Sequence, residues 1–176
     1  SSQDTAEYKA QFFQGEKFID LTCGFGIDAF FLSQNFSEIS LIEQNSELLD
    51  IVKYNWEVLG REANFINQKL EHFLENNTER FNLIYLDPAR RDNHNRKVFL
   101  LEDLSPNLIE IQEQLSEISD EILIKLSPLI DLQHLVSSLQ NISKIWIIAV
   151  KNEVKEVLVH IKKSEIEVEI SCVNLQ

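Results

Sequence analysis

The chain has 176 residues, 44% of them hydrophobic, and a formal net charge of −13 at pH 7. This size and apolar content suffice for one domain with a single buried core. The negative charge argues against a broad nucleic-acid-binding face, because neutralising phosphates needs basic side chains.

The chain shows no apolar run that could span a bilayer and no signal peptide, so we expect a soluble protein without a membrane partner. Cys23 and Cys172 are too few for a disulfide framework and lack metal-ligand spacing, which favours a reducing cytoplasmic setting. The chain contains no methionine. We therefore expect a fragment of a longer protein, and its oligomeric state stays open.

Apolar periodicity and turn residues predict helices and strands that alternate along the chain. In the first half we expect helices at 5–13, 28–34, 46–58 (with Ser46 as its N-cap) and 70–76, and strands at 17–21, 39–43 and 63–66. In the second half we expect strands at 81–86, 121–125, 144–150 and 165–173, helices at 107–118, 129–139 and 152–161, and a polar, mobile segment at 90–99.

The first strand runs directly into a glycine loop and a helix start. Gly24 and Gly26 would let backbone N–H groups approach a ligand, with Asp20 and Asp28 at the edges of the loop. Glu43 ends the second strand, where a doubly wound sheet places its ribose-binding carboxylate. A loop of this short form favours a cofactor without a pyrophosphate. The alternative is a tight turn that only joins strand to helix.

The Asp-x-x-x-Gly-x-Gly pattern with Glu43 resembles class I S-adenosylmethionine (SAM)-dependent methyltransferases. The resemblance implies an α/β, Rossmann-like, seven-stranded, mostly parallel sheet of order 3-2-1-4-5-7-6, with strand 7 antiparallel and helices on both faces. Residues 1–14 would form a helix near the cofactor site, and 15–176 the methyltransferase domain. The residues implied to bind SAM are Lys9, Asp20, Thr22, Cys23, Gly24, Phe25, Gly26, Asp28, Glu43, Gln44, Leu70 and Asp87.

Within this set, Gly24 and Gly26 would leave room for the methionine part of SAM. Asp20 would bind the amino group of that part, and Glu43 would accept hydrogen bonds from both ribose hydroxyls. The acid that usually binds adenine after strand three is absent, because the chain has Gln68-Lys69-Leu70 there. That contact would come from another group, such as Glu71, or be missing.

Asp87-Pro88-Ala89-Arg90-Arg91 follows the fourth strand, at the switch point of such a sheet. It resembles the Asn/Asp-Pro-Pro-aromatic motif of nucleobase amino-methyltransferases. Asp87 and the Pro88 carbonyl would orient the acceptor, and Arg90 would stack on a base or clamp a phosphate. Arg90, Arg91 and Arg96 are the candidate substrate-binding residues. Alternatively, Asp-Pro only ends the strand and Arg90 pairs with a surface acid.

Sugar 2′-hydroxyl methyltransferases suggest a second interpretation, with a Lys-Asp-Lys-Glu set around the target and a lysine that takes the hydroxyl proton. Lys9, Asp87, Lys125 and Glu153 lie on corresponding elements. Lys125 is the candidate base. Alternatively, the Lys125 side chain only reaches the edge of the sheet or pairs with Asp87.

Several motifs together resemble a bacterial family of class I methyltransferases with a THUMP-like, RNA-binding C-terminal domain. They are Thr5-Ala6-x-Tyr8-Lys9-Ala10, 20–28, 87–91, Lys125-Leu126-Ser127-Pro128 and Asn152-Glu153-x-Lys155-Glu156. The resemblance implies that this domain is absent from the chain and that RNA binds through missing flanking domains.

The remaining candidates favour structural roles. Cys23 is expected to fill space, with a catalytic thiol as the alternative, and Trp56 and Trp146 are expected in the core. The four histidines lack ligand spacing, so we expect no metal. The resemblance implies a SAM-dependent methyltransferase (EC 2.1.1.-), and we expect it to act on an RNA base amine or sugar hydroxyl. Alternatives are a non-catalytic binding module of a larger RNA-binding protein, and methylation of a protein or small molecule.

Overall fold

The computed structural model describes residues 2–90, 100–163 and 167–176. The chain divides into two compact units, the first ending at Leu86 and the second beginning at Asp87. Within the described ranges, no helix combines the length and apolar character needed to cross a membrane.

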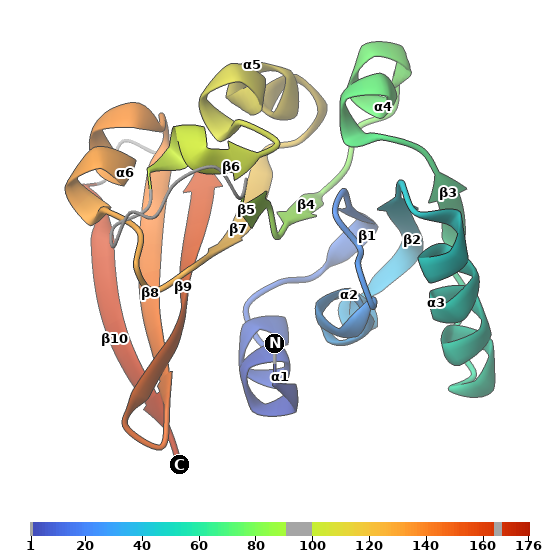
Figure 1. Cartoon of the computed structure of the whole chain (residues 1–176), viewed down its shortest axis with the longest axis horizontal. Helices are drawn as coiled ribbons and strands as arrows, with labels where there is room; N and C mark the ends of the chain where they lie inside the picture. Colours follow the sequence, from blue (N-terminus) through green and yellow to red (C-terminus); the bar gives the residue numbers. More distant parts are fainter. Residues whose placement is uncertain (1, 91–99, 164–166) are drawn as a thin grey trace. The chain divides into compact units, whose positions relative to one another are not determined.

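The first unit is a parallel sheet in the order β4-β1-β2-β3 with helices around it (Figure 1). Its strands are β1 (Gly15–Asp20), β2 (Phe36–Glu43), β3 (Asn64–Asn67) and β4 (Leu83–Leu86). Its helices are α1 (Gln3–Ala10), α2 (Ile27–Leu32), the short η1 (Ser33–Asn35), α3 (Ser46–Val58) and α4 (Leu70–Asn76).

Continuous apolar runs form the centre of this sheet. All four residues of β4 are buried, which is typical of a parallel strand covered on both faces. Helix α3 places Trp56 edge-on against Phe30 and Phe65, so the core role expected for Trp56 is confirmed. The N-cap of α3 is Asn45, whose side chain accepts from the Leu48 N–H, and not Ser46 as predicted. Asn45 sits one residue earlier, where the backbone is still extended.

The second unit contains a mixed sheet in the order β7-β9-β8-β10. Its strands are β7 (Glu121–Leu126), β8 (Ile142–Val150), β9 (Glu153–Lys162) and β10 (Glu169–Leu175), and its helices are α5 (Leu108–Ile118) and α6 (Leu132–Ser138). A separate two-stranded ribbon joins β5 (Ala89–Arg90) to β6 (Leu104–Ser105), with the short η2 (Leu101–Asp103) before β6.

The helix predicted at 152–161 is wrong, because this segment is β9 and runs antiparallel to both β7 and β8. Lys151 and Asn152 have φ of 50° and 66° and form the two-residue hairpin turn between β8 and β9. Positive φ at both turn positions matches the type I′ turn that suits strand twist. The Val- and Ile-rich part of β9 is mostly buried, and buried β-branched residues favour a strand.

The expected sheet has an antiparallel strand between the strands predicted at 121–125 and 144–150, which are β7 and β8. Such a strand is present, but it is β9 and not the strand predicted at 165–173. The last strand, β10, lies at the edge and is parallel to β8. Trp146 of β8 is buried, as expected. The mobile segment predicted at 90–99 begins with Arg90 in β5, and its remaining residues lie outside the described part of the chain.

Candidate functional site: a glycine loop and a lysine–aspartate pair

The glycine loop of the first unit depends on two left-handed residues. Gly24 has φ of 52°, and Gly26, the N-cap of α2, has φ of 71°. A Cβ on Gly26 would lie 2.8 Å from Val52 Cγ1 and 3.0 Å from Trp56 Nε1, whereas one on Gly24 would meet only the Thr22 carbonyl at 3.9 Å. Gly26 thus lets α2 pack closely on α3, and Gly24 leaves the space beside the loop open.

Two carboxylates hold the loop from the ends of β1 and β2. The buried Asp20 accepts the Thr22 N–H at 2.9 Å. Glu43 accepts the Gly24 N–H at 3.0 Å through Oε2 and the Asn45 N–H at 2.9 Å through Oε1. Each carboxylate oxygen can accept two hydrogen bonds, so Glu43 retains acceptor capacity for a pair of hydroxyl donors. This donor and acceptor set fits the ribose of a nucleoside cofactor.

Lys9 and Asp28, both expected to bind the cofactor, bind each other. Lys9 Nζ lies 2.7 Å from Asp28 Oδ1, and the Tyr85 hydroxyl donates to Asp28 Oδ2 at 2.8 Å. All three residues are buried, and the contact ties α1 to the start of α2. The sequence reasoning missed Tyr85. A tyrosine in an otherwise apolar strand was the available signal, because a buried hydroxyl needs a partner.

The remaining residues implied for SAM binding differ in exposure. Burial raises the pKa of the Cys23 thiol far above its usual range, and the charges of Asp20 and Glu43 raise it further. The thiol stays protonated at neutral pH, which favours the space-filling role. Phe25 is 68% exposed, Gln44 is exposed, and Leu70 is buried at the start of α4.

The second unit brings together two residues predicted to be catalytic. Lys125 of β7 forms an ion pair with Asp87, as the alternative interpretation of Lys125 had it. The Asp87 side chain is 40% exposed and that of Lys125 15%. Pro88 is buried, and Arg90 is exposed on the β5–β6 ribbon. The pair therefore presents its carboxylate to solvent.

Arg91 and Arg96, the other candidate substrate-binding residues, lie outside the described residues.

Glu153 does not join this pair. It is exposed at the start of β9, where its carboxylate binds Lys155 at 2.6 Å. The residue opposite Lys125 is Leu158, and Glu153 lies five residues before it along β9. Glu156 is the nearer acid. Side chains alternate along a strand, so Glu156 shares a face with Leu158 and is a diagonal neighbour of Lys125. Glu156 is also only 4% exposed, a burial that sequence alone did not reveal.

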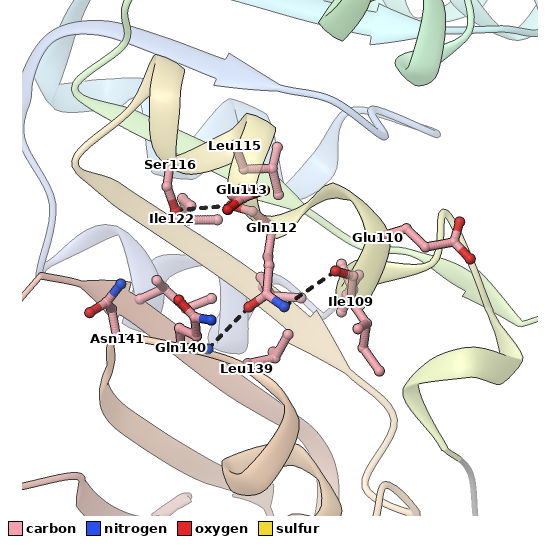
Figure 2. A pocket seen from close by; sticks show the side chains of 13 residues that line it. Ile109, Glu110, Gln112, Glu113, Leu115, Ser116, Ile122, Leu139, Gln140 and Asn141 are labelled. Carbon is pink, nitrogen blue, oxygen red and sulfur yellow. Dashed lines mark hydrogen bonds between the residues drawn. The ribbon is translucent and has the colours of Figure 1, made fainter.

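The second unit also contains a cavity of about 290 Å³ (Figure 2). Gln112 of α5 spans it, donating to the Ile109 carbonyl at 3.2 Å and accepting the Gln140 N–H at 3.1 Å. None of the predicted site residues lines it. Across the described ranges, no group of three or more His, Cys, Asp and Glu side chains could hold a metal ion.

Comparison with known proteins gives the family. A family model described as Conserved hypothetical protein 95 matches residues 5–125. The chain is 32% identical to a candidate methyltransferase from Porphyromonas gingivalis W83, with a TM-score of 0.82 over 94% of this chain and 41% of that one. A search of curated protein sequences found no match.

More distant solved structures show the fold. An rRNA methylase from Streptococcus thermophilus is 15% identical, with a TM-score of 0.62 over 92% of this chain and 96% of that one. M. capricolum TrmK, solved with S-adenosyl-homocysteine, is 16% identical, with a TM-score of 0.65 over 93% and 71% of the two chains.

The mostly parallel, Rossmann-like α/β class expected from the sequence is confirmed, and solved structures of this fold include two methyltransferase-type proteins in complex with S-adenosyl-homocysteine. The chain spans 41% of the length of the P. gingivalis protein. With the glycine loop and its two carboxylates in place, the family match over 5–125 shows that this chain belongs to the Conserved hypothetical protein 95 family and has the class I SAM-dependent methyltransferase fold.

Proposed function

We propose that the chain is the SAM-dependent methyltransferase domain of a longer protein and that it methylates RNA. The observation that carries the proposal is the Glu43 carboxylate, which two backbone N–H groups orient beside the glycine loop. In an open α/β sheet, ligands bind beyond the carboxyl ends of the strands, and Asp20 and Glu43 are the last residues of β1 and β2.

Three residues of the first unit would each bind or make room for a different part of the cofactor. Glu43 would accept hydrogen bonds from the ribose hydroxyls, Asp20 would bind the amino group, and Gly24 would let the backbone approach the methionine part. When bound, SAM supplies a methyl group carried on a sulfonium. Transfer then depends mainly on holding the acceptor in line with that methyl group, a role we assign to Asp87, Pro88 and Arg90.

Two observations support RNA as the acceptor. Structural neighbours include proteins named as rRNA methylases. Arg90 is exposed three residues after Asp87, where a guanidinium could stack on a base or bind a phosphate. With a net charge of −13, the chain would depend on RNA-binding parts beyond it, such as the THUMP-like domain of the family that it resembles.

Calorimetric titration with SAM, and separately with NAD, tests the cofactor. We expect saturable binding of SAM alone. Glu43→Ala should weaken SAM binding at least 10-fold, because it removes two hydrogen bonds to a charged acceptor. Glu47→Ala, an exposed acid in the first turn of α3, is the matched control and should leave the affinity unchanged. Equal affinities for the two variants would place the ribose elsewhere.

A second function, a binding module without catalysis, is favoured by two departures from the methyltransferase pattern. Lys69 is exposed and Leu70 buried where an acid usually binds adenine, and Arg90 replaces an aromatic residue after Asp-Pro. Binding of SAM without methyl transfer to any RNA would select this function.

A further inference from the structure

Three buried residues of the first unit fix the start of α2, directly after the glycine loop. Asp28 lies in the first turn of α2, with one carboxylate oxygen beside Lys9 Nζ of α1 and the other beside the Tyr85 hydroxyl of β4. We propose that Lys9 and Tyr85 are positioning residues for SAM, which hold Asp28 and, through it, the loop. This inference rests on the proposed function, because it concerns how the cofactor site keeps its shape.

The second half of the loop needs such an anchor. The carboxylates at the ends of β1 and β2 hold only its first half, up to Gly24. Beyond Gly24, the side chains of Phe25 and Ile27 are 68% and 45% exposed, and Gly26 between them has no side chain. Asp28 is the first buried side chain after this stretch. The position of the second half of the loop therefore depends on how firmly Asp28 is held.

Tyr85 connects the two ends of the loop to one residue of β4. Its backbone carbonyl accepts the Leu21 N–H at 3.0 Å, where β1 ends and the loop begins. Its hydroxyl donates to Asp28 at 2.8 Å, where the loop has ended. Since β4 pairs with β1 in the middle of the sheet and all its residues are buried, Tyr85 is itself firmly placed. One side chain thus sets the distance that the loop spans.

Burial makes the contacts of Asp28 specific. Lys9 is 0% exposed and Tyr85 is 1% exposed, and Lys9 Nζ lies 6.0 Å from the centroid of the Tyr85 ring. In such a place, a polar group that moves away from its partners finds no water to replace them, so other positions of the Asp28 carboxylate cost free energy. The cluster therefore favours one arrangement of the start of α2.

Helix α1 is coupled to the loop through this cluster. The helix has eight residues and lies against α2 (Figure 1). A helix of this length is marginal alone in water, and apart from Lys9 it buries only the small side chains of Thr5, Ala6 and Ala10. Its docked state therefore draws on the contact of Lys9 with Asp28. Because coupling between two sites is reciprocal, docked α1 and bound SAM should stabilise each other by the same factor.

Calorimetric titration of the chain with SAM tests the proposal, at a temperature where circular dichroism shows each variant folded. Lys9→Met should weaken SAM binding by about 10-fold, a usual size for coupled sites. Tyr85→Phe, which removes only the hydroxyl, should weaken it by a smaller factor. Phe36→Ala is the matched control, because Phe36 is buried at the end of β2 opposite Glu43. It should lower the stability and leave the SAM affinity unchanged.

The outcomes separate this inference from the proposed function. An unchanged affinity in both Lys9→Met and Tyr85→Phe would overturn the inference and leave the proposed function intact. An equal loss in Phe36→Ala would show that affinity only follows stability and would also overturn it. Absence of SAM binding in the wild-type chain would overturn the proposed function itself. If Lys9→Met does not fold, Tyr85→Phe decides.

Hydrogen exchange gives a second readout that needs no activity. Exchange of the amides in residues 3–10 measures the opening of α1. Saturating SAM should slow this exchange by about 10-fold in the wild-type chain, the factor found by titration, and should leave it unchanged in Lys9→Met. The amides of α5, in the second unit, are the control and should exchange alike in the two proteins. Equal slowing of residues 3–10 in both would show that Lys9 does not couple α1 to the cofactor.

Discussion

At the scale of single residues, Gly26 and Gly60 share a left-handed backbone but differ in their surroundings. Gly60 has φ of 70°, and a Cβ added there would meet no atom within 4 Å, whereas a Cβ on Gly26 would clash with Val52 and Trp56. Gly60→Ala should therefore lower the free energy of unfolding by about 1 kcal/mol from backbone strain alone.

Gly26→Ala should lower it by about 2–4 kcal/mol, because overpacking adds to the same strain. Urea unfolding of both variants measures the difference. Similar losses would mean that α3 moves aside and that the loop does not depend on close packing against this helix.

Thiol reactivity separates the two cysteines. Cys172 is exposed, whereas Cys23 is buried with a raised pKa. Since the thiolate is the reactive form, we expect one thiol per chain to react quickly with a disulfide reagent at pH 8. Cys172→Ser should remove this fast phase. A fast phase that persists in Cys172→Ser would show that Cys23 ionises readily and would reopen its catalytic role.

At the scale of elements, the β8–β9 hairpin depends on a two-residue turn. Lys151 has φ of 50°, which costs a non-glycine residue free energy, so Lys151→Gly should stabilise the protein by about 0.5–1 kcal/mol. The matched control, Lys155→Gly, places glycine within β9 and should destabilise it by a similar amount. Urea unfolding measures both. A loss of stability in each variant would mean that the turn has another conformation in solution.

Local sequence predicted the elements whose signals are local. The bounds of α3 and α4 agree with prediction, because apolar spacing and end signals lie within each segment. The prediction for segment 153–162 was wrong, because its charged start resembles the start of a helix. Its pairing with β7 and β8 as a strand depends on residues that are distant in the sequence.

The same distinction applies to the site. The positions of Asp20 and Glu43 at strand ends predict a role at the loop, and in the structure both carboxylates accept hydrogen bonds from loop N–H groups. Pairing of Lys9 with Asp28, and burial of Glu156, depend on tertiary contacts that spacing cannot specify.

At the scale of the whole molecule, acid should destabilise the protein in two stages. Burial lowers the pKa of His160, although Glu121 partly opposes this. The unfolded chain then binds more protons than the folded one below about pH 6.5, so the free energy of unfolding falls as the pH drops through the folded pKa of His160. The lowered pKa of Glu102, held by a backbone hydrogen bond and His134, adds a loss only below about pH 4.5.

His160→Gln should flatten the first stage and leave the second. Urea unfolding between pH 7.5 and 4 measures both, and a first stage of unchanged size in the variant would assign it to another group.

The buried Lys9–Asp28 contact has a consequence for how this family can change over evolution. Losing either charge alone leaves the other buried without its main partner, a defect of about 3–5 kcal/mol that most domains cannot tolerate. Positions 9 and 28 should therefore vary together among homologues, as Lys with an acid or as two uncharged residues. Helix α1 would then be inherited with the glycine loop as one unit, and a lineage that lost the helix would have to neutralise position 28 first.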